Sequence, residues 1–249
     1  MDLFALDGRR ALITGGSRGI GFALARGLAR AGAEIVLNGR DAESLAAACA
    51  TLAAEGAKAS AAVFDATSPE AVAAGVGALG PVDILVNCAG IQHRAPLEDF
   101  PYDRWKAIQA TNLDSAFLVS QAVAPGMIAR KSGKIINICS VQSELGRPSI
   151  TPYAASKGGL KMLTKGMCAE WARHGIQANG LAPGYFRTDM TKALVEDRDF
   201  SAWLAARTPA ARWGEVEELV GACIFLASPA SSFVNGQILY VDGGMTSVV

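Results

Sequence analysis

The chain has 249 residues, 51% of them hydrophobic, which is enough to build the core of one α/β domain over 1–249. Its 23 basic residues equal its 23 acidic ones, and no long run of one sign occurs. This balance argues against nucleic acid or a membrane surface as partner, so we expect a small molecule. With no apolar core typical of a signal peptide and no membrane-length apolar run, we expect a cytoplasmic protein. The five cysteines form no C-x-x-C pair, and we expect reduced thiols and no metal site.

Short β-rich runs alternate with longer Ala-rich helical segments along the whole chain. This alternation is typical of βαβ units, and strands this short and apolar are typical of a parallel sheet covered on both faces. The expected strands are, in chain order, Arg10–Thr14, Glu34–Asn38, Lys58–Phe64, Val82–Asn87, Lys134–Cys139, Gln177–Leu181 and Gln237–Val241. The sequence therefore predicts one doubly wound α/β Rossmann domain with a seven-stranded parallel sheet.

Capping residues mark the ends of several expected helices. Asp41 is suited to cap a helix that stops at Gly56, and Ser68 followed by Pro69 is typical of an N-cap with proline in the first helical position. The other helices are expected over Phe22–Ala31, Tyr102–Arg130, Pro152–His174 and Glu215–Ala227. The polar, aromatic segment 184–209 is interpreted as a helical substrate flap, because long excursions at the carboxyl ends of strands often carry binding function.

A glycine-rich turn, T-G-G-S-R-G-I-G, lies between the first expected strand and its helix. Glycine lets the backbone approach a pyrophosphate, and the helix amino terminus offers free N–H groups to it. The expected cofactor-binding residues of this turn are Gly15, Ser17, Arg18, Gly19, Ile20 and Gly21. A purely structural glycine turn is the plain alternative.

The same turn also fits a rival motif, because Gly15-x-Ser17-x-Gly19 matches the nucleophile elbow of an α/β-hydrolase. That reading needs a histidine partner, and the chain has only His93 and His174. We treat a hydrolase with Ser17 as nucleophile as a remote alternative.

The end of the second expected strand bears on the choice of cofactor. An acidic side chain there would bind the ribose hydroxyls of NAD, but this chain has Asn38, Gly39 and Arg40. Arg40 and Arg18 are suited to bind the 2′-phosphate of NADP. Asp65, at the end of the third expected strand, is placed to reach the adenine, and a simple turn role is its alternative. The alternative interpretation is that both arginines are solvated surface residues without a ligand. The sequence favours NADP(H).

The chain contains two Tyr-x-x-x-Lys patterns, Tyr153 with Lys157 and Tyr102 with Lys106. Four residues are about one helical turn, so within a helix the cation sits beside the phenol and favours the phenolate, which suits proton transfer to a carbonyl. Only the first pair has a serine, Ser140, at the end of the preceding strand. We therefore expect chemistry at Tyr153 and a plain helix surface at Tyr102.

Together the motifs resemble the short-chain dehydrogenases/reductases. They are T-G-x-x-x-G-x-G, Asn87-Cys88-Ala89-Gly90, Asn112, Ser140, Tyr153-x-x-x-Lys157, Pro183-Gly184 and Val241-Asp242-Gly243-Gly244. They stand in order and cover almost the whole chain, with one departure at Cys88, where the family more often has a second asparagine. The resemblance implies hydride transfer by a nicotinamide cofactor and a homotetramer built on paired helices.

The resemblance also implies a role for each catalytic residue. Tyr153 exchanges a proton with the substrate oxygen, Ser140 hydrogen-bonds that oxygen, and Lys157 supports the tyrosine and positions the nicotinamide ribose. Asn112 is implied to hold a water in a proton relay to Lys157. Further implied cofactor contacts are Asn38, Asn87, Ala89, Gly90, Tyr153, Lys157, Pro183, Gly184 and Thr188.

Within the family, local stretches such as 138–145 and 182–186 resemble members that reduce 5-ketogluconate to gluconate reversibly with NADP. Arg94 and Arg147 are candidates for binding a sugar-acid carboxylate. Candidates for binding hydroxyls are Gln92, Gln142, Ser143, Glu144 and Tyr185. For each of these polar residues, the alternative interpretation is a solvated surface position without a ligand. A reductase of another polyol, sugar acid or 3-oxoacyl substrate is the main alternative, and a non-catalytic NADP-binding protein is a remote one.

Overall fold

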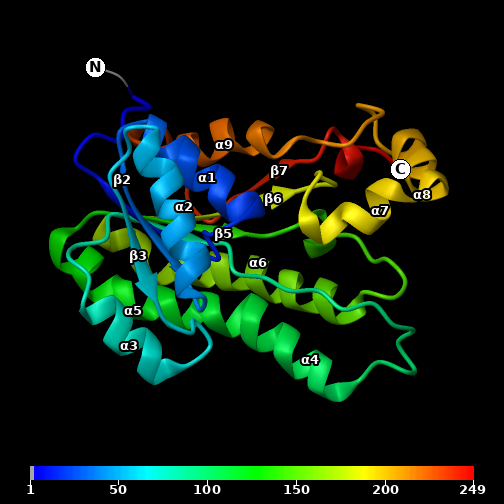
Figure 1. Cartoon of the computed structure of the whole chain (residues 1–249), viewed down its shortest axis with the longest axis horizontal. Helices are drawn as coiled ribbons and strands as arrows, with labels where there is room; N and C mark the ends of the chain where they lie inside the picture. Colours follow the sequence, from blue (N-terminus) through cyan, green and yellow to red (C-terminus); the bar gives the residue numbers. More distant parts are fainter. Residues whose placement is uncertain (1–2) are drawn as a thin grey trace.

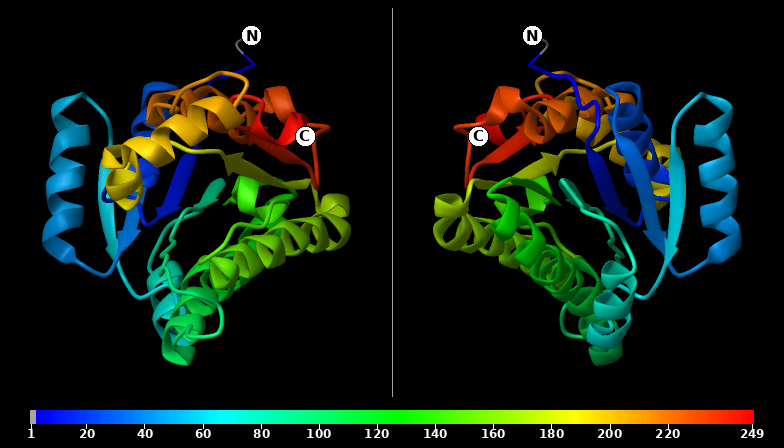
Figure 2. Two further views of the ribbon diagram at one scale, coloured as in Figure 1. Left: turned by 90° about the vertical axis from the view of Figure 1, so that its right-hand side faces the viewer. Right: turned by 90° about the vertical axis from the view of Figure 1, so that its left-hand side faces the viewer.

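The computed structural model describes residues 3–249 and consists of a seven-stranded sheet between two layers of helices (Figure 1). All strand pairs are parallel, and the strand order is β3-β2-β1-β4-β5-β6-β7. The order reverses direction between β1 and β4, which in doubly wound sheets is where ligands bind. The predicted Rossmann fold is confirmed, and the end-on views show the twist of the sheet (Figure 2).

The strands agree closely with expectation. They are β1 (Arg10–Thr14), β2 (Glu34–Gly39), β3 (Ala59–Val63), β4 (Ile84–Asn87), β5 (Gly133–Ile138), β6 (Ile176–Pro183) and β7 (Ile238–Val241). Alternate side chains of a strand point to opposite faces, so Ile13 packs in the core on one face of β1 and Leu12 in the core on the other. The near-continuous apolar runs of the strands follow from this double burial.

Each face of the sheet has its own group of helices. The first group is α1 (Gly19–Arg30), α2 (Ala42–Ala54) and α9 (Val220–Ala227), and the second is α3 (Pro69–Gly77), α5 (Ser115–Arg130) and α6 (Thr151–Trp171). Asp41 accepts a hydrogen bond from the backbone N–H of Ser44, and Ser68 from that of Ala71, so both expected N-caps are confirmed. None of the helices described over 3–249 is long and apolar enough to span a membrane.

Three expected helices differ in detail, and one of them, Pro152–His174, consists of α6 followed by a 3-10 turn (Ala172–His174). The segment Tyr102–Arg130 is helical throughout but is made of α4 (Tyr102–Gln109), a π-helical turn (Ala110–Asp114) and α5. The segment Glu215–Ala227 begins as a 3-10 turn (Val216–Leu219) before α9. Apolar periodicity reports that a segment is helical, but it does not report one extra residue inserted in a turn, so the sequence did not predict the π-turn.

The expected flap consists of short elements at the carboxyl end of the sheet, near the carboxyl terminus of the chain in Figure 1. They are a 3-10 turn (Asp189–Thr191), α7 (Lys192–Glu196) and α8 (Arg198–Arg207). Leu194 and Leu204 from these helices pack with Val141, Trp213 and Met245 in a small separate core. The flap is therefore seated on the loop that follows β5.

Candidate functional site

Tyr153 and Lys157 lie one turn apart near the start of α6, as their spacing predicted. The Nζ atom of Lys157 is 5.7 Å from the centre of the Tyr153 ring. This ammonium is buried and donates a hydrogen bond of 2.6 Å to the carbonyl oxygen of Ile138, the last residue of β5. Tyr153 is half-buried, and its hydroxyl has no hydrogen-bond partner among residues 3–249. The lysine is therefore fixed, while the phenol hydroxyl is free for a ligand.

Ser140 follows β5 directly and starts a 3-10 turn, Val141–Ser143. Its Oγ accepts a hydrogen bond of 3.1 Å from the backbone N–H of Gln142. A hydroxyl that accepts in this way still has its own proton to donate. Ser140 is thus arranged as a hydrogen-bond donor at the carboxyl edge of the sheet.

Asn112 lies in the π-turn between α4 and α5 and is fully buried. Its Oδ1 accepts from the backbone N–H of Ile91 at 2.8 Å, and its Nδ2 donates to the carbonyl of Ile91 at 3.0 Å and to Ser156 Oγ at 3.1 Å. Both amide hydrogens are therefore used within the protein. The side chain anchors the loop after β4, so the expected water relay would have to use the main-chain carbonyl of Asn112.

The glycine turn has the geometry that its sequence requires. Gly15 and Gly19 have positive φ angles of 64° and 55°, where other residues are strained. A Cβ atom added to Gly21 would collide with the carbonyl oxygen of Gly15. Thr14 Oγ1 accepts from the backbone N–H groups of Cys88 and Ala89, at 3.0 and 3.1 Å, and so ties the turn to the loop after β4. The amino end of α1 therefore lies close to the turn, and no side chain from these glycines covers it.

The two arginines expected at the cofactor are exposed, and neither forms an ion pair among residues 3–249. The pKa of the Asp65 carboxyl is lowered, mainly by hydrogen bonds from the backbone N–H and the hydroxyl of Thr67, and further by the charge of Arg40. Arg40 and Asp65 thus face the same region, whereas Arg18 stands at the amino end of α1. These cations are available for an anionic ligand.

Several other expected cofactor positions use their side chains internally. Asn38 donates from Nδ2 to the carbonyls of Ala62 and Phe64, both at 3.0 Å, which joins β2 to β3. Asn87 donates to Ser120 and Asn137 inside the core. The Nδ2 groups of both residues are therefore occupied, whereas Asn87 Oδ1 is buried without a hydrogen-bond partner among the described residues.

The remaining expected positions surround the same edge. Gly90 lies beside the catalytic pair, since a Cβ atom on it would be 3.9 Å from Lys157 Nζ. At Gly184, directly after β6 and Pro183, a Cβ atom would lie 2.7 Å from the Cα of Asp242, so only glycine fits. The Thr188 hydroxyl is within hydrogen-bond distance of the Thr191 hydroxyl and backbone N–H in a capping box. Ile20 is half-buried at the start of α1.

Arg94 and Arg147 come from the loops after β4 and β5, which are joined by a hydrogen bond of 3.2 Å from the backbone N–H of Ala95 to the carbonyl of Ser149. Arg94 is exposed and Arg147 is half-buried. The pKa of Arg94 is lowered, mainly by partial desolvation and further by the charge of Arg147, while Tyr185 acts in the opposite direction. Neither arginine has a carboxylate partner among the described residues. Two neighbouring guanidinium groups that repel each other form a site that favours an anion.

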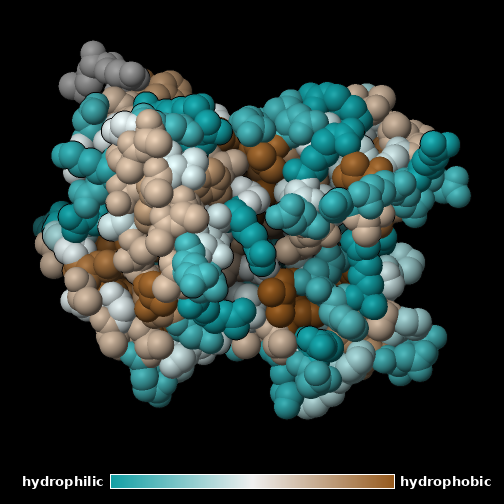
Figure 3. Space-filling model, in the orientation of Figure 1, coloured by the Kyte–Doolittle hydropathy of each residue, from teal (hydrophilic) through white to brown (hydrophobic). Residues whose placement is uncertain are grey.

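An aromatic cluster formed by the flap and the neighbouring Trp213 supports this pair, and of its members only Tyr185 was expected at the site. The guanidinium carbon of Arg147 lies 4.7 Å from the centre of the Phe200 ring. The rings of Tyr185, Phe200, Trp203 and Trp213 pack with centre-to-centre distances from 5.1 to 6.2 Å. The only signal was the high aromatic content of 184–213. The space-filling view shows the surface indented beside this part of the molecule (Figure 3).

Two residues expected to bind hydroxyls are used within the protein instead. The Ser143 hydroxyl donates to the carbonyl of Lys157 at 2.9 Å. The Glu144 carboxylate accepts from Lys161 and, at 2.9 Å, from the Tyr240 hydroxyl. These bonds fasten the loop after β5 to α6 and β7.

The rival motifs do not form sites. Tyr102 is 69% exposed on α4, and Lys106 Nζ lies 5.1 Å from its ring as a surface pair. His174 precedes β6 and so lies at the amino end of the sheet, opposite Ser17, which follows the carboxyl end of β1. His93 packs its ring against Phe100. Ser17 has no histidine partner, and the hydrolase alternative fails.

Known proteins with similar sequences and structures agree with this arrangement. Residues 15–246 match the family described as Enoyl-(Acyl carrier protein) reductase. The chain is 63% identical to gluconate 5-dehydrogenase of Gluconobacter oxydans, over 98% of this chain and 97% of that protein. It is 57% identical to 5-keto-D-gluconate 5-reductase of Escherichia coli K12, over 100% of this chain and 99% of that protein.

Solved structures include one with ligands. A gluconate 5-dehydrogenase from Burkholderia cenocepacia, in complex with NADP and tartrate, superposes with a TM-score of 0.97 at 62% identity and covers 100% of this chain and 99% of that one. A short-chain type dehydrogenase/reductase from Mycobacterium marinum superposes with a TM-score of 0.94 at 37% identity, covering 99% of each chain.

Proposed function

The chain belongs to the short-chain dehydrogenases/reductases, and we propose that it is an NADP(H)-dependent oxidoreductase that interconverts D-gluconate and 5-keto-D-gluconate. Two relatives at 63% and 57% identity over nearly their full lengths carry this activity in their names. The observation that carries the proposal within the site is the pair of unpartnered arginines facing the same edge of the sheet as Tyr153, Lys157 and Ser140.

The glycine turn fits a dinucleotide cofactor. Gly15 and Gly19 adopt positive φ angles, and the absence of a side chain at Gly21 lets the amino end of α1 approach the turn. Its N–H groups and dipole favour a pyrophosphate, while Arg18 and Arg40 are free to bind a 2′-phosphate. These features support NADP(H) over NAD(H), and the related enzyme from Burkholderia cenocepacia was solved with NADP.

The chemistry divides between cofactor and protein. When bound, the reduced nicotinamide supplies the hydride that adds to C5 of 5-ketogluconate. Tyr153 donates its phenolic proton to the carbonyl oxygen, which becomes the C5 hydroxyl, and Ser140 donates a hydrogen bond to that oxygen as its charge develops. The buried ammonium of Lys157 stabilises the phenolate left behind until it is reprotonated. Oxidation of gluconate reverses each of these steps.

The substrate carboxylate is assigned to Arg94 and Arg147, with Tyr185 and the other flap aromatics closing over the sugar chain. An anion placed between the arginines would relieve their mutual repulsion and replace the missing carboxylate partner. In this role the segment 184–209 acts as a substrate flap within a single domain, 1–249. Aromatic side chains suit a polyhydroxylated ligand, because their faces pack against its C–H groups.

A reductase of another polyol or sugar acid is the second candidate. It is favoured by a relative at 42% identity, the galactitol 2-dehydrogenase of Cereibacter sphaeroides, which covers 98% of this chain. A neutral polyol would leave the arginine pair without an anion, which is why the sugar acid is preferred. A non-catalytic NADP-binding role gives no reason for the free Tyr153 hydroxyl beside a fixed lysine.

The test is a screen of NADPH oxidation with purified protein. The substrates are 5-ketogluconate, other keto sugar acids, neutral ketoses and 3-oxoacyl thioesters. The proposal expects the highest kcat/KM with 5-ketogluconate and gluconate as the product. A higher kcat/KM with a neutral ketose or an acyl thioester would contradict it.

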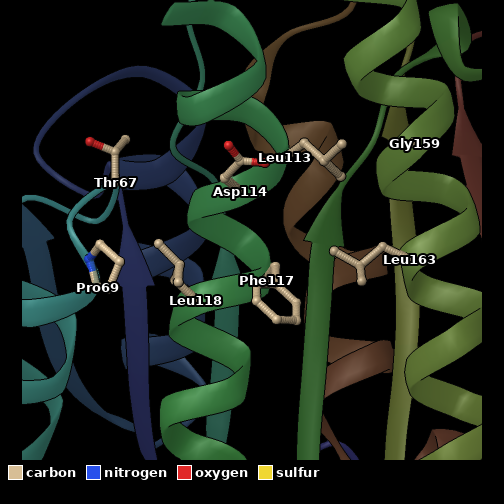
Figure 4. A pocket seen from close by; sticks show the side chains of 8 residues that line it. All are labelled: Thr67, Pro69, Leu113, Asp114, Phe117, Leu118, Gly159 and Leu163. Atoms are coloured by element: carbon tan, nitrogen blue, oxygen red, sulfur yellow. The ribbon is translucent and has the colours of Figure 1, made fainter. Parts of the chain in front are cut away.

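Assembly is a further part of the proposal, with a second copy of the chain as the partner in a homotetramer. A groove of about 630 Å³ lies on the outer side of α5 and α6, lined by Leu113, Phe117, Leu118 and Leu163 among others (Figure 4). Phe117 is 45% exposed in it, and Met162 on α6 is 62% exposed. Apolar side chains of this size are normally covered. Light scattering should give a tetramer, and Phe117→Glu should give smaller species. A monomeric wild-type protein would contradict this assembly.

A further inference from the structure

We propose that the side-chain amide of Gln142 binds a hydroxyl group of the substrate on a carbon next to the reacting carbon. This assignment rests on the proposed oxidoreductase function and adds a rule for its substrates. The enzyme selects substrates that carry a hydroxyl beside the carbonyl and discriminates against deoxy analogues at that position.

The first observation is an unused hydrogen-bonding group. Gln142 is only 8% exposed, and its Oε1 atom is buried without a hydrogen-bond partner in residues 3–249. Its Nε2 atom likewise makes no hydrogen bond to the described residues. Buried amides of this kind are normally paired, so the empty amide indicates a ligand group that completes it.

The second observation is where this amide lies. Gln142 stands two residues after Ser140, and its backbone N–H donates to the Ser140 hydroxyl that faces the reacting oxygen. Val141, between them, packs under the flap against Leu194 and Trp213. The backbone of Gln142 therefore lies next to the serine assigned to the reacting oxygen, and the residue between them packs under the flap. In the proposed arrangement, the amide that extends from this turn meets the substrate at a carbon next to the reacting one.

The third observation concerns the neighbours of Gln142. The Ser143 hydroxyl is used by the carbonyl of Lys157, and the Glu144 carboxylate is used by Lys161 and Tyr240. Among the polar side chains of the segment 142–144, only Gln142 keeps its hydrogen-bonding capacity. Glu144 and Tyr240 fasten the turn, so the backbone from which the Gln142 side chain extends is held in place.

This arrangement predicts a specific form of discrimination. A site built to hydrogen-bond a substrate hydroxyl rejects the analogue that lacks it, because the buried amide is then left unpaired after water has been excluded. Ser140 and Tyr153 bind the reacting oxygen on C5 itself. Gln142 therefore distinguishes substrates that carry a hydroxyl on the carbon next to C5 from substrates that lack it. The relevant hydroxyls of gluconate are those on C4 and C6.

The experiment compares kcat/KM for D-gluconate, 4-deoxy-D-gluconate and 6-deoxy-D-gluconate in the wild type and in Gln142→Met, which keeps the length of the side chain and removes the amide. We expect the variant to lose about 10- to 100-fold in kcat/KM with gluconate and little with one of the two deoxy substrates. The ratio between the substrates therefore collapses. The control is Glu144→Gln, which loosens the turn and is expected to lower all three values by the same factor.

Two results would overturn the assignment. One is a gluconate to deoxygluconate ratio that Gln142→Met leaves unchanged for both analogues. The other is full activity with a weaker affinity for NADPH, which would mean that the amide binds the cofactor. Failure of the proposed function is recognised separately, because the wild type would then not turn over gluconate at all.

Discussion

Replacement of Arg147 by leucine separates recognition of a carboxylate from support of the flap. The change removes one guanidinium from the unpartnered pair with Arg94 and also removes its stacking on Phe200. Loss of a charge-assisted hydrogen bond costs about 1.5–3 kcal/mol. Loss of the stacking costs a further ~0.5–2 kcal/mol. Only the first cost depends on the charge of the substrate.

The assay uses D-gluconate and D-gluconamide, which have the same hydroxyls but differ in charge. At about 1.4 kcal/mol per factor of ten, Arg147→Leu should lower the gluconate to gluconamide ratio of kcat/KM by about 10- to 100-fold. The loss of stacking should lower both values together. Arg147→Lys keeps the charge without the planar fork, so it should retain part of the discrimination. Some preference should persist in every variant because Arg94 remains.

If Arg147→Leu lowers kcat/KM equally for the acid and the amide, Arg147 does not bind the substrate carboxylate and only supports the flap through Phe200. That result would also leave the substrate carboxylate without an assigned partner.

Three further predictions concern the cofactor, the glycine turn and stability in acid. Arg40→Asp should lower the NADPH to NADH ratio of kcat/KM by about 10- to 100-fold, because one phosphate contact is lost and an acid is added; an unchanged ratio would assign Arg40 to the surface. Gly21→Ala should abolish the NADP-induced rise in Tm, because its Cβ collides with the turn, whereas Gly77→Ala, where a methyl group meets open space, should keep that rise. Arg212 holds the pKa of Glu218 at about 2 against an ordinary 4.5, so this contribution to stability is complete above pH 4.5 and is lost as the pH falls towards 2. Glu218→Gln should therefore flatten the fall of Tm in that range, and an equally steep fall would contradict the assignment.

The sheet was predictable because its signals are local. Apolar runs marked all seven strands within two residues at each end, and the caps Asp41 and Ser68 marked two helix starts. The doubly wound parallel arrangement was predicted from the alternation of strands and helices, whereas the order of the strands came from the structure. The π-turn around Asn112 had no such signal, because it changes the hydrogen bonding of a helix without changing its apolar pattern.

Side-chain directions were less predictable than positions. Asn38 and Asn87 stand next to the expected cofactor site, but their amides are turned into the sheet, and Ser143 and Glu144 are used by α6 and β7. Which polar group of a loop stays free depends on partners far away in the sequence, such as Tyr240 for Glu144. The cytoplasmic location and the roles of the site residues stay predictions.

We propose that Tyr153, and not the other tyrosine followed by a lysine at the same spacing, carries the proton. The most direct measurement is NADPH-dependent reduction of 5-ketogluconate by Tyr153→Phe and by its matched control Tyr102→Phe. A positioned general acid contributes about 10²- to 10⁴-fold, so we expect kcat to fall by about that factor in Tyr153→Phe and to remain at the wild-type value in Tyr102→Phe. Substantial activity in Tyr153→Phe, with folding and NADPH binding intact, would mean that another group supplies the proton.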